Sequence, residues 1–280
     1  MKQIEELIMS NKPVIVPWDF SEMAVDALEH AFMLNKQIKT DIILLHLVKK
    51  KSEIEEADKK LEAFVQEFDK KNGITLKYIV KDGSIFSDIN KIIEEENALF
   101  AVMGTHGIKG MQKFTGSWAL KVIVGSIAPF IVIQEKPQSE AIRRIVFPVD
   151  FKFSVKEKLI WAELMYSYFK SKFFLCFIDS TDPLFKKKIN SNMIVAKKFL
   201  TEKGVDFEII RLEGKSIEDE SIKYSGEIKA DLIMISTTRN ISFHDYMLGA
   251  AEQKVIANEL KIPVMTINPK KGLTILKGFT

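Results

Sequence analysis

Four glycines lie close together between residues 104 and 116, although the chain has only 13 glycines among its 280 residues. They are Gly104, Gly107, Gly110 and Gly116, and Ser117 follows the last of them. A glycine carries no Cβ, so its backbone N–H can approach a ligand closely. The apolar residues after Ser117 recur at helical spacing, and the N-terminus of a helix attracts anions. This stretch therefore predicts an anion-binding loop of the kind that holds a phosphate.

Two alternatives limit this interpretation. Gly104 and Gly107 are also typical of a simple tight turn, and Ser117 of a helix cap that binds nothing else. The glycines are not followed by Gly-Lys-Ser or Gly-Lys-Thr, so the stretch is not a P-loop. The elements around the loop must decide whether it serves a ligand.

The segments that flank the loop occur twice in the chain. Residues 12–21, KPVIVPWDFS, correspond to residues 143–152, RRIVFPVDFK, and both contain Pro-x-Asp-Phe. Four further pairs of segments follow in the same order at a nearly constant offset. Such an internal repeat predicts two copies of one domain, residues 1–136 and residues 142–280, joined by a short polar linker.

Within the first copy, apolar runs alternate with amphipathic segments. The runs are expected to be strands, and a helix is expected to start at Ser21 and another to end at Gly73. The expected strands are residues 13–18, 41–48, 74–80, 98–103 and 129–134. Continuous apolar strands separated by helices predict the α/β class. We expect two tandem open five-stranded parallel sheets with helices on both faces, a Rossmann-like arrangement.

Asp19 follows the first strand of the first copy, and Gly104 ends the fourth. An open parallel sheet binds ligands beyond the carboxyl ends of its strands, where the strand order reverses. If these two strands are neighbours, Asp19 and the glycine loop face one crevice.

Two stretches, IVPWDFSEMAVDALEHA and residues 102–134, resemble the universal stress protein family. The resemblance covers both copies, so the chain looks like a tandem, two-domain member of this family. The resemblance implies a fold of the adenine nucleotide alpha hydrolase type. It also implies an adenine nucleotide as ligand, ATP or another, with or without Mg²⁺. The positions that match the binding residues of the family are Pro17, Asp19, Val48, Met103, Gly104, Gly107, Gly116 and Ser117.

By this resemblance, Asp19 meets the adenosine part of the nucleotide and the backbone of Val48, or of its neighbour Leu47, meets adenine. The glycines and Ser117 meet the phosphates. The family pattern has nine residues between its second and third glycine, whereas only residues 108–115 separate Gly107 from Gly116 here. A shorter nucleotide or an empty crevice therefore stays open.

Three functions are compatible with these observations. The first is a nucleotide-binding protein of stress response and regulation, with at most weak ATPase activity. The second is a nucleotide-free member that acts as an interaction or scaffold module, and the third is an enzyme acting on a small phosphorylated substrate. No Gly-x-Ser-x-Gly motif or metal-ligand spacing supports other chemistry.

The second copy keeps an aspartate after its first strand, Asp150, but changes the loop. Ser236 and Arg239 replace the first two glycines, and Ala250 replaces the serine. We expect that this copy does not bind nucleotide in the same way as the first. Its expected role is to pair with the first copy through residues 129–134 and 262–268, as two such domains do in the family, and a further homodimer stays open.

Bulk composition excludes several classes of protein. The net charge is only +3 and the charges are interleaved, so we expect no nucleic-acid partner. No apolar run is long enough for a membrane span, and Cys176 is alone, so we expect a cytoplasmic protein without membrane contact. Trp18 and His46 are expected in the core and His30 at the surface or its boundary, while the place of Trp118 stays open.

Overall fold

The computed structural model describes residues 12–84, 88–105, 118–152, 155–237 and 250–268. In these residues, ten strands form one sheet in the order β3-β2-β1-β4-β5-β10-β9-β6-β7-β8. The strands are β1 Val14–Pro17, β2 Ile42–Val48, β3 Lys77–Asp82, β4 Phe100–Gly104, β5 Phe130–Ile133, β6 Arg144–Pro148, β7 Lys172–Ile178, β8 Phe207–Leu212, β9 Leu232–Ser236 and β10 Val264–Ile267.

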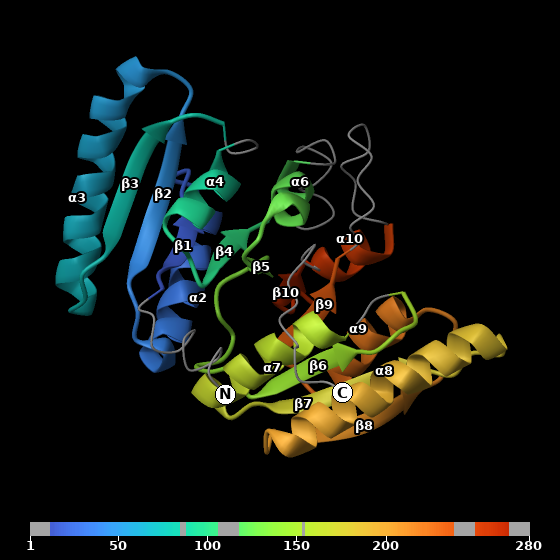
Figure 1. The fold of residues 1–280 in the computed structure, drawn as a ribbon. Coiled ribbons are helices and arrows are strands. Elements are labelled where there is room, and N and C mark those ends of the chain that lie inside the picture. Colours follow the sequence, from blue (N-terminus) through green and yellow to red (C-terminus); the bar gives the residue numbers. More distant parts are fainter. Residues whose placement is uncertain (1–11, 85–87, 106–117, 153–154, 238–249, 269–280) are drawn as a thin grey trace.

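Helices connect the strands within each half of the chain (Figure 1). They are α2 Glu22–Ile38, the 3-10 turn η1 Lys51–Glu53, α3 Ile54–Asn72, α4 Ile89–Glu95, α6 Trp118–Gly125, α7 Lys156–Phe169, α8 Pro183–Glu202, α9 Ile217–Glu227 and α10 Ala250–Ile256. We call β1 to β5 with their helices the first repeat, and β6 to β10 with theirs the second repeat. None of the helices in the described residues is long and apolar enough to cross a membrane.

Each repeat contains five parallel strands, which confirms the predicted fold class. The two repeats meet where β5 pairs with β10, with Val264 opposite Val132 and Thr266 opposite Phe130, and this pair is antiparallel. The two five-stranded units are therefore not separate sheets but halves of one, which Figure 1 shows as a first repeat in blue and green beside a second in yellow and red.

Apolar side chains cover both faces of the sheet. One buried cluster lies between the sheet and α2, α3, α7 and α8, and includes Leu28 and Phe147. The other lies under α4, α6 and α10, and includes Ile123 and Val255. Cys176 is fully buried in this second cluster, which raises the pKa of its thiol to about 12. Both clusters contain residues of the two repeats, and α2 also contacts α7.

The predicted starts and ends of elements hold where a local capping residue sets them. The Ser21 hydroxyl accepts from the Ala24 N–H at 3.1 Å and caps α2, and Gly73 ends α3 in a left-handed conformation with φ of 65°. The sequence predicts that the third strand begins at residue 74, but β3 begins later, at Lys77. The Leu76 N–H instead donates to Asp69 Oδ1 at 2.9 Å, which keeps the preceding residues beside the end of α3.

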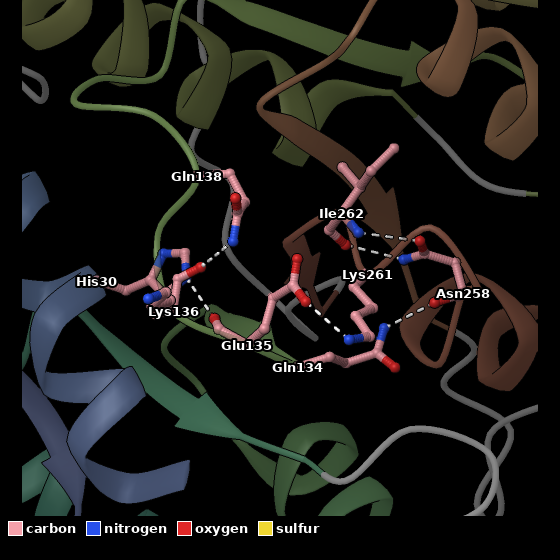
Figure 2. A network of polar contacts seen from close by, with 8 residues as sticks. All are labelled: His30, Gln134, Glu135, Lys136, Gln138, Asn258, Lys261 and Ile262. Atoms are coloured by element: carbon pink, nitrogen blue, oxygen red, sulfur yellow. Dashed lines mark hydrogen bonds and ion pairs between the residues drawn. The ribbon is translucent and has the colours of Figure 1, made fainter. Parts of the chain in front are cut away.

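His30 is not at the surface, contrary to the sequence-based expectation. It is only 4% exposed, and its Nε2 donates to the carbonyl oxygen of Glu135 at 2.9 Å, on the segment that joins the repeats (Figure 2). Burial lowers the pKa of His30 from 6.5 to about 4. The neutral imidazole therefore ties α2 to the segment between the repeats.

We expect His30→Gln to make the protein more resistant to acid. Between pH 6.5 and about pH 4 the unfolded chain binds a proton at His30 and the folded chain does not, so wild-type stability falls as the pH falls through this window. The loss amounts to about 3 kcal/mol at its lower end. Urea unfolding of both proteins across this range measures it, and parallel stability curves would contradict the prediction.

Candidate functional site

The strand order reverses next to β1. From β1 the chain continues outward to β2 and β3, and then returns to β4 on the other side of β1. Val14 of β1 pairs with both Ile42 of β2 and Phe100 of β4. The carboxyl ends of β1 and β4 therefore lie next to each other at the point where open parallel sheets bind ligands.

Asp19 lies just beyond the end of β1, and its carboxylate is exposed. Its Oδ1 accepts two hydrogen bonds from Ser21, one from the backbone N–H at 3.0 Å and one from the hydroxyl at 2.5 Å. Because Ser21 also caps α2, the carboxylate is fixed relative to the helix start. Among the described residues, Asp19 Oδ2 accepts no hydrogen bond and is left for another partner.

Phe20 turns the chain sharply between Asp19 and the start of α2. Its φ is 62°, in the left-handed region that non-glycine residues seldom adopt. Its ring lies 4.9 Å from the ring of His46, and the Lys60 ammonium sits 4.0 Å from its centre. These contacts hold a conformation that costs on the order of 1 kcal/mol or more, and so set the direction in which Asp19 points.

Gly104 ends β4 and packs against the first turn of α2. A Cβ at this position would come within 2.2 Å of Met23 Cγ and 2.7 Å of the Met23 carbonyl oxygen. No side chain fits there without moving the helix. Gly104 therefore has a packing requirement of its own, whether or not a ligand approaches it.

The remaining predicted site residues divide into two groups. Pro17 ends β1, Val48 ends β2 and Met103 lies in β4, next to its last residue. The structure therefore places them at or near the carboxyl ends of the strands, as it does Asp19. The side chains of Val48 and Met103 are buried in the core, and the Val48 carbonyl already accepts from the Gly83 N–H at 2.9 Å. Gly107, Gly116 and Ser117 lie outside the described residues, as does the loop between β4 and α6.

Trp18 lies in the core as the sequence indicated, whereas His46 lies at the margin of the core. Trp18 is 4% exposed and packs against Phe64, with ring centres 4.5 Å apart. His46 is half-buried, and its Nδ1 forms a 2.7 Å hydrogen bond with the Trp18 carbonyl oxygen. Neither ring is therefore free to stack on a ligand in this arrangement. The Trp118 side chain lies outside what the structure describes.

Sequence reasoning missed Thr105, which directly follows Gly104. Its N–H donates to the Ile133 carbonyl at 2.8 Å, but its hydroxyl is buried and has no partner among the described residues. A buried hydroxyl without a partner costs about 1–3 kcal/mol. The recurrence of threonine at the matching position, Thr237, is the signal in the sequence that would have singled it out.

The matching crevice of the second repeat contains a lysine. Lys158 is 4% exposed, its Nζ donates to the Pro148 carbonyl at 2.5 Å, and it lies 4.2 Å from the centre of the Phe147 ring. Burial lowers the pKa of Lys158 to about 8, although nearby Asp150 acts in the opposite direction. Ala27, ten residues after Pro17 as Lys158 is ten after Pro148, is the counterpart in the first repeat.

Little space remains around Lys158. A cavity of about 40 Å³ opens beside its side chain, and it is lined further by Asp150, Glu218, Ser236 and Glu252. Ligand pockets usually measure about 300–1,000 Å³, so this cavity suits a water molecule or two rather than a nucleotide. No group of acidic, histidine or cysteine residues in the described ranges is arranged to hold a metal ion.

Comparison with known proteins finds similarity to one family. The model of the universal stress protein family matches residues 10–134. A universal stress protein of Methanocaldococcus jannaschii is 25% identical over 149 residues, which cover 46% of this chain and 85% of the relative. Another from the same organism is 28% identical over 156 residues, which cover 45% of this chain and 96% of the relative.

The fold of the whole chain has a counterpart among solved structures. The crystal structure of a universal stress protein from Archaeoglobus fulgidus DSM 4304 covers 95% of this chain and 99% of its own, with a TM-score of 0.74 and 19% identity. At this identity the likeness concerns the fold. It extends across both repeats, whereas the sequence relatives match about half of the chain.

We expect Gly104→Ala to destabilise the protein by about 1–3 kcal/mol, because the new methyl group would overlap Met23. Adding Met23→Ala should restore only part of the loss, since the Met23 carbonyl oxygen still stands 2.7 Å from the new Cβ. Urea unfolding of the wild type, the single variant and the double variant measures both effects. A fully stable Gly104→Ala protein would contradict the packing requirement.

We expect Lys158→Met to remove a rise in stability at alkaline pH. Between about pH 8 and pH 10.5 the folded wild type has released the Lys158 proton and the unfolded chain has not, so its stability increases with pH by up to about 3 kcal/mol. Unfolding free energies of the two proteins, with exposed Lys197→Met as control, should diverge across this window. Equal slopes for wild type and Lys158→Met would contradict the burial of the ammonium.

Proposed function

Because residues 10–134 belong to the universal stress protein family, we propose that this chain binds an adenine nucleotide, ATP or AMP, in its first repeat. Binding would serve stress response and regulation rather than a dedicated enzymatic reaction. The observation that carries the proposal is the position of Asp19 beside Gly104, on neighbouring strands where the strand order reverses.

The chemistry of Asp19 supports this role. Its carboxylate is exposed at the strand ends, Ser21 fixes its Oδ1, and its Oδ2 is open among the described residues. An ionised carboxylate accepts hydrogen bonds only, as recognition of ribose hydroxyls requires. We assign Asp19 to the nucleoside and the backbone at Val48 to adenine.

The phosphates belong at the other side of the crevice. Gly104 starts the connection from β4 to α6, and the N-terminal end of α6 carries the partial positive charge that suits an anion. We assign Gly107, Gly116 and Ser117 to the phosphates, and include Pro17 and Met103 among the residues that bind the nucleotide. Mg²⁺ accompanies a bound triphosphate.

The second repeat, within a proposed domain of residues 142–280, takes a structural role in this proposal. The nucleotide is proposed to bind in a first domain of residues 1–136. In the second repeat, Lys158 is buried at the matching position and the cavity beside it is too small for a nucleotide. Its strand β10 supplies the partner of β5. Apart from Asp19, which is assigned to the nucleoside, we name no general base, so any ATP hydrolysis is expected to be weak.

The test is isothermal calorimetry with ATP, ADP and AMP in the presence of Mg²⁺. We expect one nucleotide per chain, and at least tenfold weaker binding after Asp19→Ala, since removing a hydrogen-bonding partner of this kind costs about 1.5–3 kcal/mol. Gly107→Val should abolish binding. The matched variant Asp150→Ala, at the same position of the second repeat, should leave both affinity and stoichiometry unchanged.

Two outcomes would overturn the proposal. An absence of binding at millimolar nucleotide would favour the alternative of a nucleotide-free interaction module. Equal losses from Asp19→Ala and Asp150→Ala would mean that the crevice of the first repeat is not the site.

A further inference from the structure

Each repeat extends one polar side chain across the boundary to the other. Gln134 follows β5, and Asn268 follows β10. Since β5 and β10 are antiparallel, each residue emerges beside a helix of the opposite repeat. Figure 2 shows the Gln134 side of this exchange, next to the ion pair of 2.8 Å between Lys261 and Glu135.

Both side chains donate to carbonyl groups at the end of a helix. Gln134 Nε2 donates to the carbonyls of Ile256 at 3.4 Å and Asn258 at 3.0 Å, at the end of α10. Asn268 Nδ2 donates to the carbonyls of Val124 at 3.2 Å and Ser126 at 2.8 Å, at the end of α6. It also contacts the Ile123 carbonyl.

The last carbonyls of a helix have no partner within the helix and need donors from elsewhere. Donors of the same repeat meet part of this need, since Asn90 Nδ2 donates to the Val122 carbonyl of α6 at 2.9 Å and Asn258 Nδ2 to the Val255 carbonyl of α10 at 3.0 Å. Gln134 and Asn268 add donors from the other repeat. A cap of this kind holds the end of the helix at a fixed distance from the strand that carries the donor. The C-terminal end of α6 is therefore held in part by the residue that follows β10, and that of α10 by the residue that follows β5.

The two caps differ in the contacts that hold the capping amide. The Thr237 hydroxyl, which belongs to a residue only 1% exposed, donates to Asn268 Oδ1 and so fixes the orientation of the amide. Its counterpart Thr105 has a buried hydroxyl with no partner among the described residues, so it gives Gln134 no such support there. The better-anchored cap is the one on α6, the helix of the first repeat.

We propose that Asn268 is a positioning residue for the nucleotide site of the first repeat, and that it acts through α6. This inference rests on the proposed function. In that proposal the N-terminal end of α6 faces the phosphates. Because α6 is a short, continuous helix, a contact that fixes its C-terminal end also limits the movement of its N-terminal end. The second repeat thereby contributes to a crevice that it does not line.

The test compares two matched variants of the full chain. Asn268→Leu keeps a side chain of similar size but removes the amide that donates to the end of α6. Gln134→Met in the same way removes the amide that donates to the end of α10. By calorimetry, Asn268→Leu should weaken nucleotide binding roughly three- to tenfold, which corresponds to the loss of one hydrogen bond. Gln134→Met should leave nucleotide binding unchanged, because α10 carries Glu252 and Val255 to the other crevice.

Hydrogen exchange without nucleotide gives a second, independent measurement. Amide protection of residues 118–126 should fall in Asn268→Leu, and that of residues 250–258 in Gln134→Met. Asn268→Gln should restore protection and affinity, since glutamine performs this role at position 134. If Asn268→Leu does not fold, Thr237→Val is the substitute variant. It keeps the Asn268 amide and removes only the hydroxyl that orients it, so it should lower nucleotide affinity and amide protection by a smaller amount.

The outcomes separate this inference from the proposed function. If the wild type binds nucleotide and Asn268→Leu binds it equally well, the inference is overturned and the function stands. If the wild type binds no nucleotide, the proposed function fails and with it the link from Asn268 to the site. Unchanged exchange in residues 118–126 would overturn the cap itself.

Discussion

The antiparallel pairing of β5 with β10 is the constraint on which the rest of the structure depends. A five-stranded parallel sheet that ended at β5 would expose a row of unpaired backbone groups, which is a site for aggregation. Pairing the two last strands removes both inner edges at once and leaves β3 and β8 as the outer edges. It also continues both apolar clusters from one repeat into the other, so the halves share their core.

This pairing explains why contacts near the boundary come from both repeats. His30 bonds to the segment after β5, and α2 lies against α7. β4 and β9 each lie one strand away from the junction, and their carboxyl ends point in opposite directions because β5 and β10 are antiparallel.

Local patterns in the sequence predicted most of the fold, because caps and apolar runs act on their own neighbourhood. Ser21 and Gly73 marked helix ends correctly, and Asp19 and Gly104 lie at the carboxyl ends of neighbouring strands, as the sequence predicts. What the sequence missed depends on distant partners. The glycine at 104 is required by Met23, the burial of His30 by the segment at Glu135, and the start of β3 by a hydrogen bond to Asp69. Such contacts have no signature in the local sequence.

The lysine in the second crevice has a consequence for symmetry. In a dimer of identical subunits, every substitution appears in both sites, so a lysine that fills one crevice fills the other as well. Here Ala27 and Lys158 are encoded separately, so the second repeat can carry a buried lysine at a position where the first repeat keeps a buried alanine. Covalent fusion thus lets the two halves diverge in chemistry while the sheet between them retains its near-twofold geometry.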